Sequence, residues 1–261
     1  MDTALFTDCN FMKVIINSDD LGYSNSENDA IFRAMSNSKI TSASLIANGA
    51  GFEDAVSRIG NFPQCSFGVH LNVTEFRPLR QSKKYDELNL IDLNGFWKGD
   101  IRQTPRYLRS TLVDDVRQEW GLQIEKCLDN NIPISHLDSH HHVHTIPWLW
   151  PAVRDVQVKY NIKRIRNTKN LYPAKMRPSY TIVMLKKIWD YRMRNICGIV
   201  STDYFTDFSS FFEDINVNQN RTVELMCHLG KKDNLAEELL LYSDWAMRIP
   251  FAIEMISYNQ L

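Results

Sequence analysis

The sequence predicts an α/β protein, namely a single-domain (β/α) barrel-like fold with about seven parallel strands. Two observations predict it. Short β-branched runs alternate with segments of helical period along the 261 residues, and no break in composition divides the chain. Polar residues also follow directly after several of these runs. Because α/β folds place their active sites at the C-terminal ends of the strands, we expect the active site there.

The first half of the chain alternates between strand and helix patterns. The expected elements are, in order, a strand at Lys13–Ile16, a helix from Glu27 to Ser38, a strand at Ser42–Ala47, a helix at Phe52–Ile59 and a strand at Ser66–Val69. Residues 72–112 contain scattered Pro and Gly and no clear period, so we interpret them as a long insertion. We expect one domain at residues 12–261, preceded by a flexible extension at residues 1–11.

The same alternation continues to the C-terminus. The expected elements are a helix over Val113–Leu128, a strand at Ile134–Leu137, a helix from Pro147 to about Tyr160, strands at Arg164–Arg166, Ile199–Thr202 and Thr222–Met226, and an amphipathic helix over Asp233–Arg248. Asp233 is a candidate cap for the last helix. The basic stretch from Lys175 to Arg194 has two interpretations, a subunit contact in a homodimer or an exposed helix face.

Composition narrows the class of function. Thirty basic residues stand against 31 acidic ones, without the basic excess typical of nucleic-acid binding. No apolar run approaches the ~18–20 residues that span a bilayer, and the segment Met1–Met12 has no basic residue, unlike a signal peptide. The five cysteines are dispersed and form no C-x-x-C pair. We therefore expect a cytoplasmic protein with reduced thiols that binds neither nucleic acid nor a membrane.

Histidines are concentrated in one short segment. Five of the seven histidines lie between His136 and His144. Imidazole is the commonest metal-binding side chain and titrates near neutrality, so this cluster indicates a metal site or acid–base catalysis. If the segment is extended, His140 and His142 share one face; if it is helical, His140 and His144 align at i, i+4. Asp138 is either a carboxylate that orients a histidine ring or a cap of the turn.

Three other candidates also follow predicted strands. Asp19 and Asp20 are adjacent carboxylates, which suggests one metal ligand and one base; a polar loop with a helix cap is the alternative. His70 and His228 each end a strand, where a structural, hydrogen-bonded histidine is the alternative. Since the C-terminal ends of parallel strands lie at one rim, these residues are expected to meet there.

The motifs together resemble the YdjC/ChbG family of carbohydrate deacetylases. The motifs that carry the resemblance are Val14-Ile-Ile-Asn-Ser-Asp-Asp-Leu-Gly22, Thr41-Ser-Ala-Ser-Leu-Ile-Ala-Asn48, Gly68-Val-His-Leu-Asn-Val-Thr74, His136-Leu-Asp-Ser-His-His-His-Val-His144 and Glu224-Leu-Met-Cys-His-Leu-Gly230. From Val14 to Gly230, these motifs follow one another in the same order as in the family. Ser18, Leu21 and Leu229 differ from the residues common there, and these changes concern substrate shape more than chemistry.

The resemblance implies a function and a set of roles. The family removes N-acetyl groups from chitooligosaccharides or related sugars with a divalent metal, usually Mg²⁺. Carried over, Asp20, His70 and His140 would bind the metal, Asp19 would be the base and His228 the acid. Zn²⁺, Co²⁺ or Mn²⁺ would also suit such ligands, and His144 is a reserve ligand. The expected partner is a small N-acetylated sugar.

The sequence is also compatible with two other functions. Lys163, Arg164 and Arg166 could receive a phosphate, which would suit a metal-dependent sugar-phosphate hydrolase; a solvated basic turn is the alternative. Arg166 could instead hold Asp19 or substrate, or form a surface salt bridge. From another class of protein, a non-catalytic sugar-binding module would retain the pocket and the metal without turnover.

Overall fold

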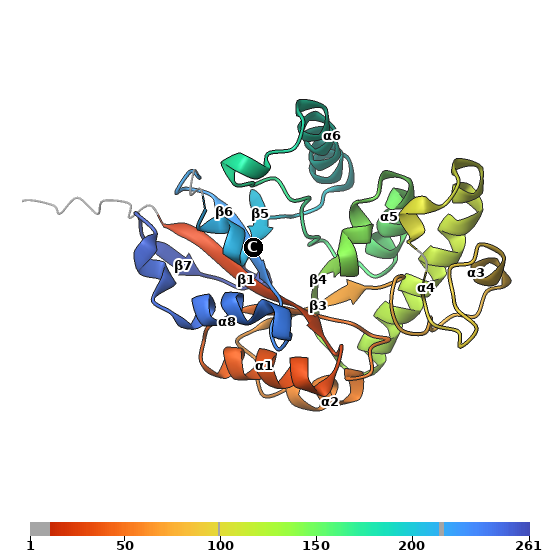
Figure 1. Cartoon of the computed structure of the whole chain (residues 1–261), viewed down its shortest axis with the longest axis horizontal. Helices are drawn as coiled ribbons and strands as arrows, with labels where there is room; N and C mark the ends of the chain where they lie inside the picture. Colours follow the sequence, from red (N-terminus) through yellow and green to blue (C-terminus); the bar gives the residue numbers. More distant parts are fainter. Residues whose placement is uncertain (1–10, 99, 214–216) are drawn as a thin grey trace, which may run out of the picture.

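A computed structural model describes residues 11–98, 100–213 and 217–261 of the chain. Within these residues seven strands form one curled parallel sheet in the order β4-β3-β2-β1-β6-β5, with β7 paired to the start of β1 (Figure 1). The strands are β1 (Met12–Leu21), β2 (Ser42–Leu45), β3 (Ser66–Leu71), β4 (Ile134–Ser139), β5 (Tyr204–Asp207), β6 (Thr222–Cys227) and β7 (Ile253–Met255). The predicted α/β barrel-like fold with about seven parallel strands is confirmed.

Isolated bridges connect the two edges of this sheet. Ile165 pairs with Leu137 at the β4 edge, and Arg164 pairs with Val200, in the segment that leads into β5. The strands predicted at Arg164–Arg166 and Ile199–Thr202 are therefore wrong, since the first segment forms two isolated bridges and the second forms one.

Side chains explain why these ladders are short. The hydroxyl of Ser201 donates to the carbonyl of Ile165 at 2.6 Å, and the side-chain amide of Asn167 donates to the carbonyl of Thr202 at 3.3 Å. These two side chains occupy the carbonyl oxygens of Ile165 and Thr202, which would accept backbone N–H groups if the ladders were longer.

Helices flank the sheet (Figure 1). They are α1 (Asn25–Ser36), α2 (Phe52–Ile59), α3 (Lys83–Glu87), α4 (Arg109–Asp129), α5 (Trp150–Lys159), α6 (Tyr180–Tyr191), α7 (Phe208–Phe211) and α8 (Leu235–Tyr242). In Figure 1, α1 and α2 lie along one side of the sheet and α6 projects away from it. Ser24 caps α1 by accepting the backbone N–H of Ser26. No helix in the described part of the chain has the length and hydrophobicity needed to cross a membrane.

The predicted C-terminal helix over Asp233–Arg248 is interrupted. α8 ends at Tyr242, and a separate 3-10 turn covers Trp245–Arg248. The hydroxyl of Ser243 donates to the carbonyl of Leu240 at 2.7 Å, which competes with continued helix. Asp233 lies inside a preceding 3-10 turn and is not the cap of α8, a position held by Asn234.

The structure describes the predicted insertion but almost none of the predicted N-terminal extension. The predicted extension at residues 1–11 lies, except for Phe11, outside the described residues. Residues 72–112, the predicted insertion, contain α3 and two short 3-10 turns, and pack on α4. Tyr85 and Trp97 from this segment are buried, with ring centroids 4.6 Å apart.

The basic stretch from Lys175 to Arg194 contains α6. This helix leaves Leu185 and Tyr191 each 65% exposed, which is compatible with a subunit contact and with an exposed helix face.

Candidate functional site

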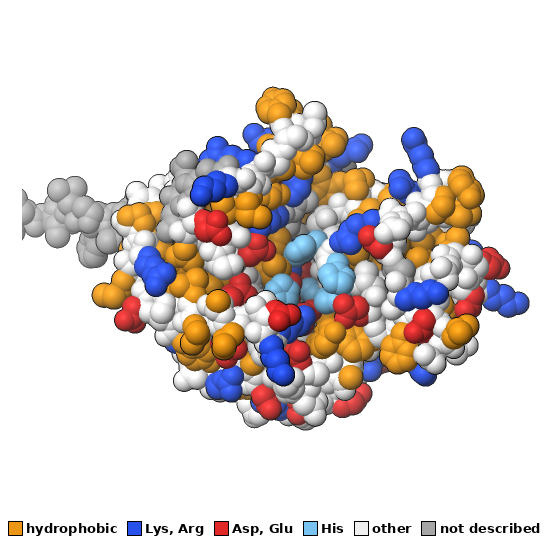
Figure 2. Space-filling model, viewed as in Figure 1, with side chains coloured by type: hydrophobic (Ala, Val, Ile, Leu, Met, Phe, Trp, Pro, Cys, Tyr) orange, Lys and Arg blue, Asp and Glu red, His pale blue; other side chains and the backbone are white. Residues whose placement is uncertain are grey.

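The polar residues that follow the strands meet at one rim of the sheet. Asp19 and Asp20 lie near the end of β1, His70 near the end of β3, and His140 directly after β4. The ring centroids of His70 and His140 are 5.5 Å apart. One ligand atom from each of Asp20, His70 and His140 lies within 4.8 Å of the others. In Figure 2 histidine side chains gather in a hollow of the molecular face.

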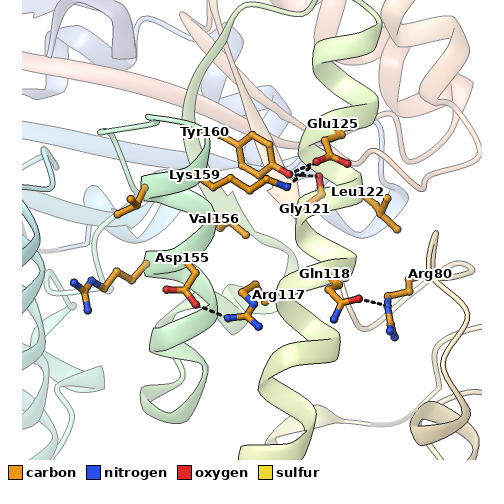
Figure 3. A pocket seen from close by; sticks show the side chains of 12 residues that line it. Arg80, Arg117, Gln118, Gly121, Leu122, Glu125, Asp155, Val156, Lys159 and Tyr160 are labelled. Atoms are coloured by element: carbon orange, nitrogen blue, oxygen red, sulfur yellow. Dashed lines mark hydrogen bonds and ion pairs between the residues drawn. The ribbon is translucent and has the colours of Figure 1, made fainter.

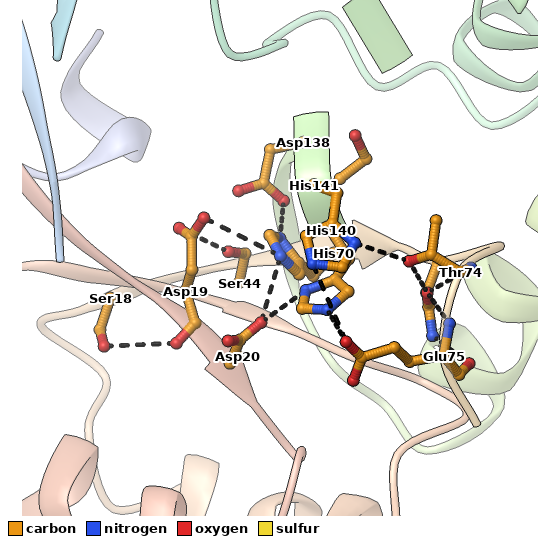
Figure 4. A network of polar contacts seen from close by, with 12 residues as sticks. Ser18, Asp19, Asp20, Ser44, His70, Thr74, Glu75, Asp138, His140 and His141 are labelled. Carbon is orange, nitrogen blue, oxygen red and sulfur yellow. Dashed lines mark hydrogen bonds and ion pairs between the residues drawn. The ribbon is translucent and has the colours of Figure 1, made fainter. Parts of the chain in front are cut away.

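A distortion of β1 lets two adjacent carboxylates reach the same site. Neighbouring residues of a regular strand point to opposite faces. In β1 the pairing register with β2 shifts between Ser18 and Leu21, and Asp20 has a φ of 67°. As a result the Nε2 atom of His70 lies 3.8 Å from Oδ2 of Asp19 and 3.4 Å from Oδ1 of Asp20 (Figure 4).

The histidine-rich segment is neither extended nor α-helical. After β4 it forms a 3-10 turn in which His141 and His142 have φ values of 52° and 54°. His144 therefore does not align with His140. Its Nδ1 lies 2.5 Å from the hydroxyl of Ser139, and its Nε2 lies 3.2 Å from the carbonyl of Arg166. With both ring nitrogens engaged, His144 is absent from the cluster of ligand atoms, which corrects its choice as reserve ligand.

The two clustered histidines are oriented in the same manner. His70 turns Nε2 to Asp20, and its Nδ1 lies 2.8 Å from Oδ1 of Asp138. His140 turns Nδ1 to Asp20 at 2.9 Å, and its Nε2 lies 3.3 Å from Oε1 of Glu75. A carboxylate behind each ring fixes its orientation and tautomer, as is usual for histidines that bind metals.

The donor set fits a divalent cation. One carboxylate oxygen and two imidazole nitrogens converge, and the buried Oδ1 of Asp20 faces both His70 and His140. Burial opposes ionisation of Asp20, but His140 and His70 hold its pKa well below the usual range. Burial likewise opposes protonation of His70, but Asp138 and Asp19 raise its pKa to about 10. A bound cation would reverse the second shift, because a ligating imidazole must be neutral.

Asp19 is held by a buried arginine, with Nε2 of His70 farther away at 3.8 Å. Arg166, 1% exposed, contacts Oδ1 and Oδ2 of Asp19 through Nη2 and Nη1 at 2.6 Å and 2.7 Å. Burial opposes ionisation, but the charge of Arg166 lowers the pKa of Asp19. Of the sequence interpretations of Arg166, the surface salt bridge is therefore wrong.

His228 follows β6 and lies beside the same charges. Burial lowers its pKa, whereas the carboxylates of Asp19 and Asp20 act in the opposite direction. Its backbone N–H donates to Oε2 of Glu237 at 2.9 Å, which fixes the chain at this point. His228 as a residue is partly exposed.

Sequence reasoning missed three charged residues of the site. Glu75 directly follows the motif that contains His70, but the irregular pattern of residues 72–112 concealed it. Lys231 forms an ion pair with Oδ2 of Asp20. Glu224, 0% exposed, contacts Nε of Arg166 at 2.8 Å. A charged residue inside the otherwise apolar run Thr222–Cys227 was the signal that could have identified Glu224.

Two of the three basic residues proposed to receive a phosphate, Arg164 and Arg166, are used elsewhere. Nη2 of Arg164 donates to the carbonyl of Asn259 at 3.2 Å, near the C-terminus of the chain. The guanidinium of Arg166 is buried among carboxylates. Neither of these two arginines offers free donors to an anion at the histidine cluster.

A separate cavity lies away from the histidine cluster. It encloses about 680 Å³ between α4 and α5 (Figure 3). Its charged groups pair with one another, as Arg117 does with Asp155 at 2.8 Å and Lys159 with Glu125 at 2.9 Å. Because it contains none of the clustered histidines or their carboxylates, it is not the candidate site.

Comparison with known proteins identifies the family. The model of the YdjC-like protein family matches residues 13–249, which include every strand end described above except that of β7. The chain belongs to the YdjC-like family. Similar proteins named carbohydrate deacetylase occur in Oceanobacillus iheyensis, 28% identical with 87% of this chain and 89% of that protein covered, and in Clostridium beijerinckii, 30% identical with 85% and 83% covered.

A solved structure shows the same fold. A provisionally assigned cellobiose-phosphate cleavage protein from Enterococcus faecalis V583 superimposes with a TM-score of 0.72 at 20% identity, with 96% of this chain and 98% of that chain covered. At this identity the likeness concerns the fold alone. It supports the barrel-like architecture of this YdjC-like protein and carries no argument about its substrate.

Proposed function

We propose that this YdjC-like protein is a metal-dependent carbohydrate deacetylase that removes N-acetyl groups from amino sugars or chitooligosaccharides and releases acetate. The observation that carries the proposal is the division between two adjacent carboxylates. Asp20 faces His70 and His140, whereas Asp19 is held by Arg166. The relatives named carbohydrate deacetylase support the reaction class.

Asp20, His70 and His140 would hold one divalent cation, for which we propose Mg²⁺, with Zn²⁺, Co²⁺ or Mn²⁺ as alternatives. When bound, such a cation polarises the acetyl carbonyl and lowers the pKa of a water molecule. Asp138 and Glu75 would keep the two imidazoles in the required orientation. His144 would support the neighbouring backbone through its contact with the carbonyl of Arg166.

The chain supplies the proton transfers. Asp19, kept ionised by Arg166, would accept a proton from the attacking water, whose oxygen then bonds the acetyl carbon. His228, when protonated, would donate a proton to the sugar nitrogen as the carbon–nitrogen bond breaks. The products are acetate and the free amine of the sugar. Asp19 and His228 would thus act as base and acid on the two sides of one bond.

Two alternatives have less support. A sugar-phosphate hydrolase would need cationic groups free to bind phosphate, and Arg164 and Arg166 are engaged elsewhere. A non-catalytic sugar-binding module would not need both Asp19 and His228 beside the ligand cluster. We further propose a small-molecule partner and a cytoplasmic location.

One assay distinguishes the three functions. The protein is incubated with N-acetylated chitooligosaccharides and separately with sugar phosphates, with and without a chelator, and acetate and phosphate are measured. We expect acetate from the first substrates, lost with the chelator and restored by added Mg²⁺ or Mn²⁺. Phosphate release would favour the hydrolase of sugar phosphates, and binding without either product would favour the module.

A further inference from the structure

Arg166 contacts three carboxylates with different parts of its guanidinium group. Its two terminal nitrogens bond Asp19, and Nη1 also lies 2.8 Å from Oδ2 of Asp138. Its Nε donates to Oε1 of Glu224 at 2.8 Å. Because the guanidinium is planar and rigid, the contact at Nε fixes the plane in which the other two nitrogens reach Asp19. Glu224 therefore determines how Arg166 presents its donors.

The second oxygen of Glu224 depends on the C-terminal turn of the chain. The hydroxyl of Tyr258 donates to Oε2 of Glu224, and both residues are 0% exposed. Burial raises the pKa of Glu224 to about 7, and the contacts with Arg166 and Tyr258 oppose this shift. Without the phenol, Oε2 would be left without this donor in a buried environment, which is costly for a carboxylate.

Tyr258 is fixed by contacts with three strands. Its backbone N–H donates to the hydroxyl of Ser66 in β3 at 3.0 Å. Its ring stacks on His136 of β4, with centroids 3.7 Å apart and planes inclined by 10°. Its hydroxyl reaches Glu224 of β6. Tyr258 also belongs to a small buried hydrophobic cluster with Ile15 and Ile256.

The alternation of side chains places this layer below the candidate site. Residues four apart in a strand point to the same face. Ser66 thus lies on the same face of β3 as His70, four residues nearer the start of the strand, and His136 and Glu224 lie four residues before His140 and His228, which directly follow β4 and β6. Tyr258 therefore occupies a polar layer inside the sheet, and Arg166 connects that layer with Asp19.

We propose that Glu224 and Tyr258 are positioning residues for Asp19: Glu224 fixes the guanidinium of Arg166, and the Tyr258 hydroxyl fixes Glu224. This inference rests on the proposed function, in which Asp19 is the base. Neither residue touches the substrate or the ligand cluster. Loss of either link lets the Asp19 carboxylate rotate out of line with the water it must deprotonate, while substrate and metal binding are retained.

The primary test is Tyr258→Phe, which removes one hydroxyl and retains the ring that stacks on His136. We expect kcat for acetate release to fall on the order of 10- to 100-fold, the effect of a small misplacement of a reacting group. KM for the N-acetylated sugar and the Mn²⁺ dissociation constant, measured by calorimetry, should not change. Tyr160→Phe is the matched control, because it removes a hydroxyl from another carboxylate, Glu125, in the cavity of Figure 3.

A second variant tests the same link from its other partner. Glu224→Gln should lower kcat in the same manner, and adding Tyr258→Phe to it should cause no further loss if the phenol acts through Glu224. Multiplicative losses in the double variant, or full kcat in a folded Tyr258→Phe protein, would overturn the inference. Asp19→Asn distinguishes failure of the proposed function from failure of the positioning role. If Asp19→Asn is active, Asp19 is not the base and the proposed function is wrong. If Asp19→Asn is inactive and Tyr258→Phe is fully active, only the positioning role is wrong.

Discussion

Arg166 and Asp19 lie 147 positions apart in the sequence and form a two-bonded, buried ion pair with distances of 2.6 Å and 2.7 Å. Asp20, the next residue, forms no such pair with Arg166 and faces His70 and His140 instead. Two chemically identical carboxylates are thus placed in different electrostatic surroundings. One is oriented as an ionised group, and the other completes a set of metal-binding atoms.

The first prediction separates these two carboxylates. Asp19→Asn retains shape but cannot accept a proton, so acetate release should fall about 10²–10⁴-fold while Mn²⁺ binding stays intact. Asp20→Asn should weaken Mn²⁺ binding by more than the ~10–100-fold typical of residues outside the ligand set. Calorimetric titration of both variants is the measurement. Loss of the ion in Asp19→Asn alone would show that the two roles are reversed.

The second prediction concerns His228. His228→Ala should leave Mn²⁺ affinity intact and slow amine release by about 10²–10⁴-fold, the contribution of a general acid. Substrates with a better leaving group need less protonation, so an aryl acetamide should be affected much less than an N-acetyl sugar. An equal effect on both substrates, or full activity on the sugar, would exclude His228 as the acid.

The strand ends were predictable because their pattern is local. Asp19, His70 and His140 each follow a short β-branched or apolar run, and the parallel arrangement brings such ends together. Glu224 and Tyr258 were not identified, because their role depends on partners that are distant in sequence. β7 was missed because three residues, Ile253–Met255, carry too little pattern to show a strand.

The backbone of the site was also beyond sequence reasoning. Adjacent side chains in a strand diverge, so no local pattern indicates that Asp19 and Asp20 both approach His70. The positive φ of Asp20 and the shifted register of β1 bring them together. The turn at His141 similarly follows from tertiary contacts, since an extended and a helical segment were equally compatible with the spacing of the histidines.

The third prediction tests the packing below the site. A Cβ atom added at Gly68 would lie 2.4 Å from the His136 ring, which is stacked on Tyr258 and cannot move freely. Gly68→Ala should therefore lower the free energy of unfolding by about 1–3 kcal/mol, measured by urea denaturation. Gly60→Ala is the control, because nothing lies within 4 Å of its added Cβ. Equal stability of the two variants would contradict the packing described here.

The fourth prediction is a pH dependence of stability. Burial raises the pKa of Glu237 from its ordinary 4.5 to about 7. Between these values the folded protein keeps a proton that the unfolded chain releases, so the free energy of unfolding falls as the pH rises. Glu237→Gln removes this penalty and should raise stability on the order of 1–3 kcal/mol above pH 7, with little effect below pH 4.5.

Thermal denaturation at pH 4.5 and at pH 8 measures this difference. Glu238→Gln is the control, because Glu238 lies on the same helix and pairs with the exposed Arg33. The side-chain amide introduced by Glu237→Gln could still accept the backbone N–H of His228, so the fold at that strand end should be retained. A stability gain of the same size at both pH values would rule out the titration of Glu237 as its cause.

The last prediction concerns Glu75, which the sequence did not reveal. Its carboxylate lies 3.3 Å from Nε2 of His140 and orients that ring toward Asp20. Glu75→Gln should weaken Mn²⁺ binding by about 10- to 100-fold, because an amide accepts the ring N–H less strongly than a carboxylate. Glu53→Gln, whose side chain is 80% exposed, serves as the control. Saturating Mn²⁺ should restore most of the acetate release of Glu75→Gln, since Glu75 acts on the ligand His140 and not on the proton transfers. If saturating metal restores nothing, Glu75 has a direct part in the reaction; if metal binding is unchanged from the start, the orienting role is excluded.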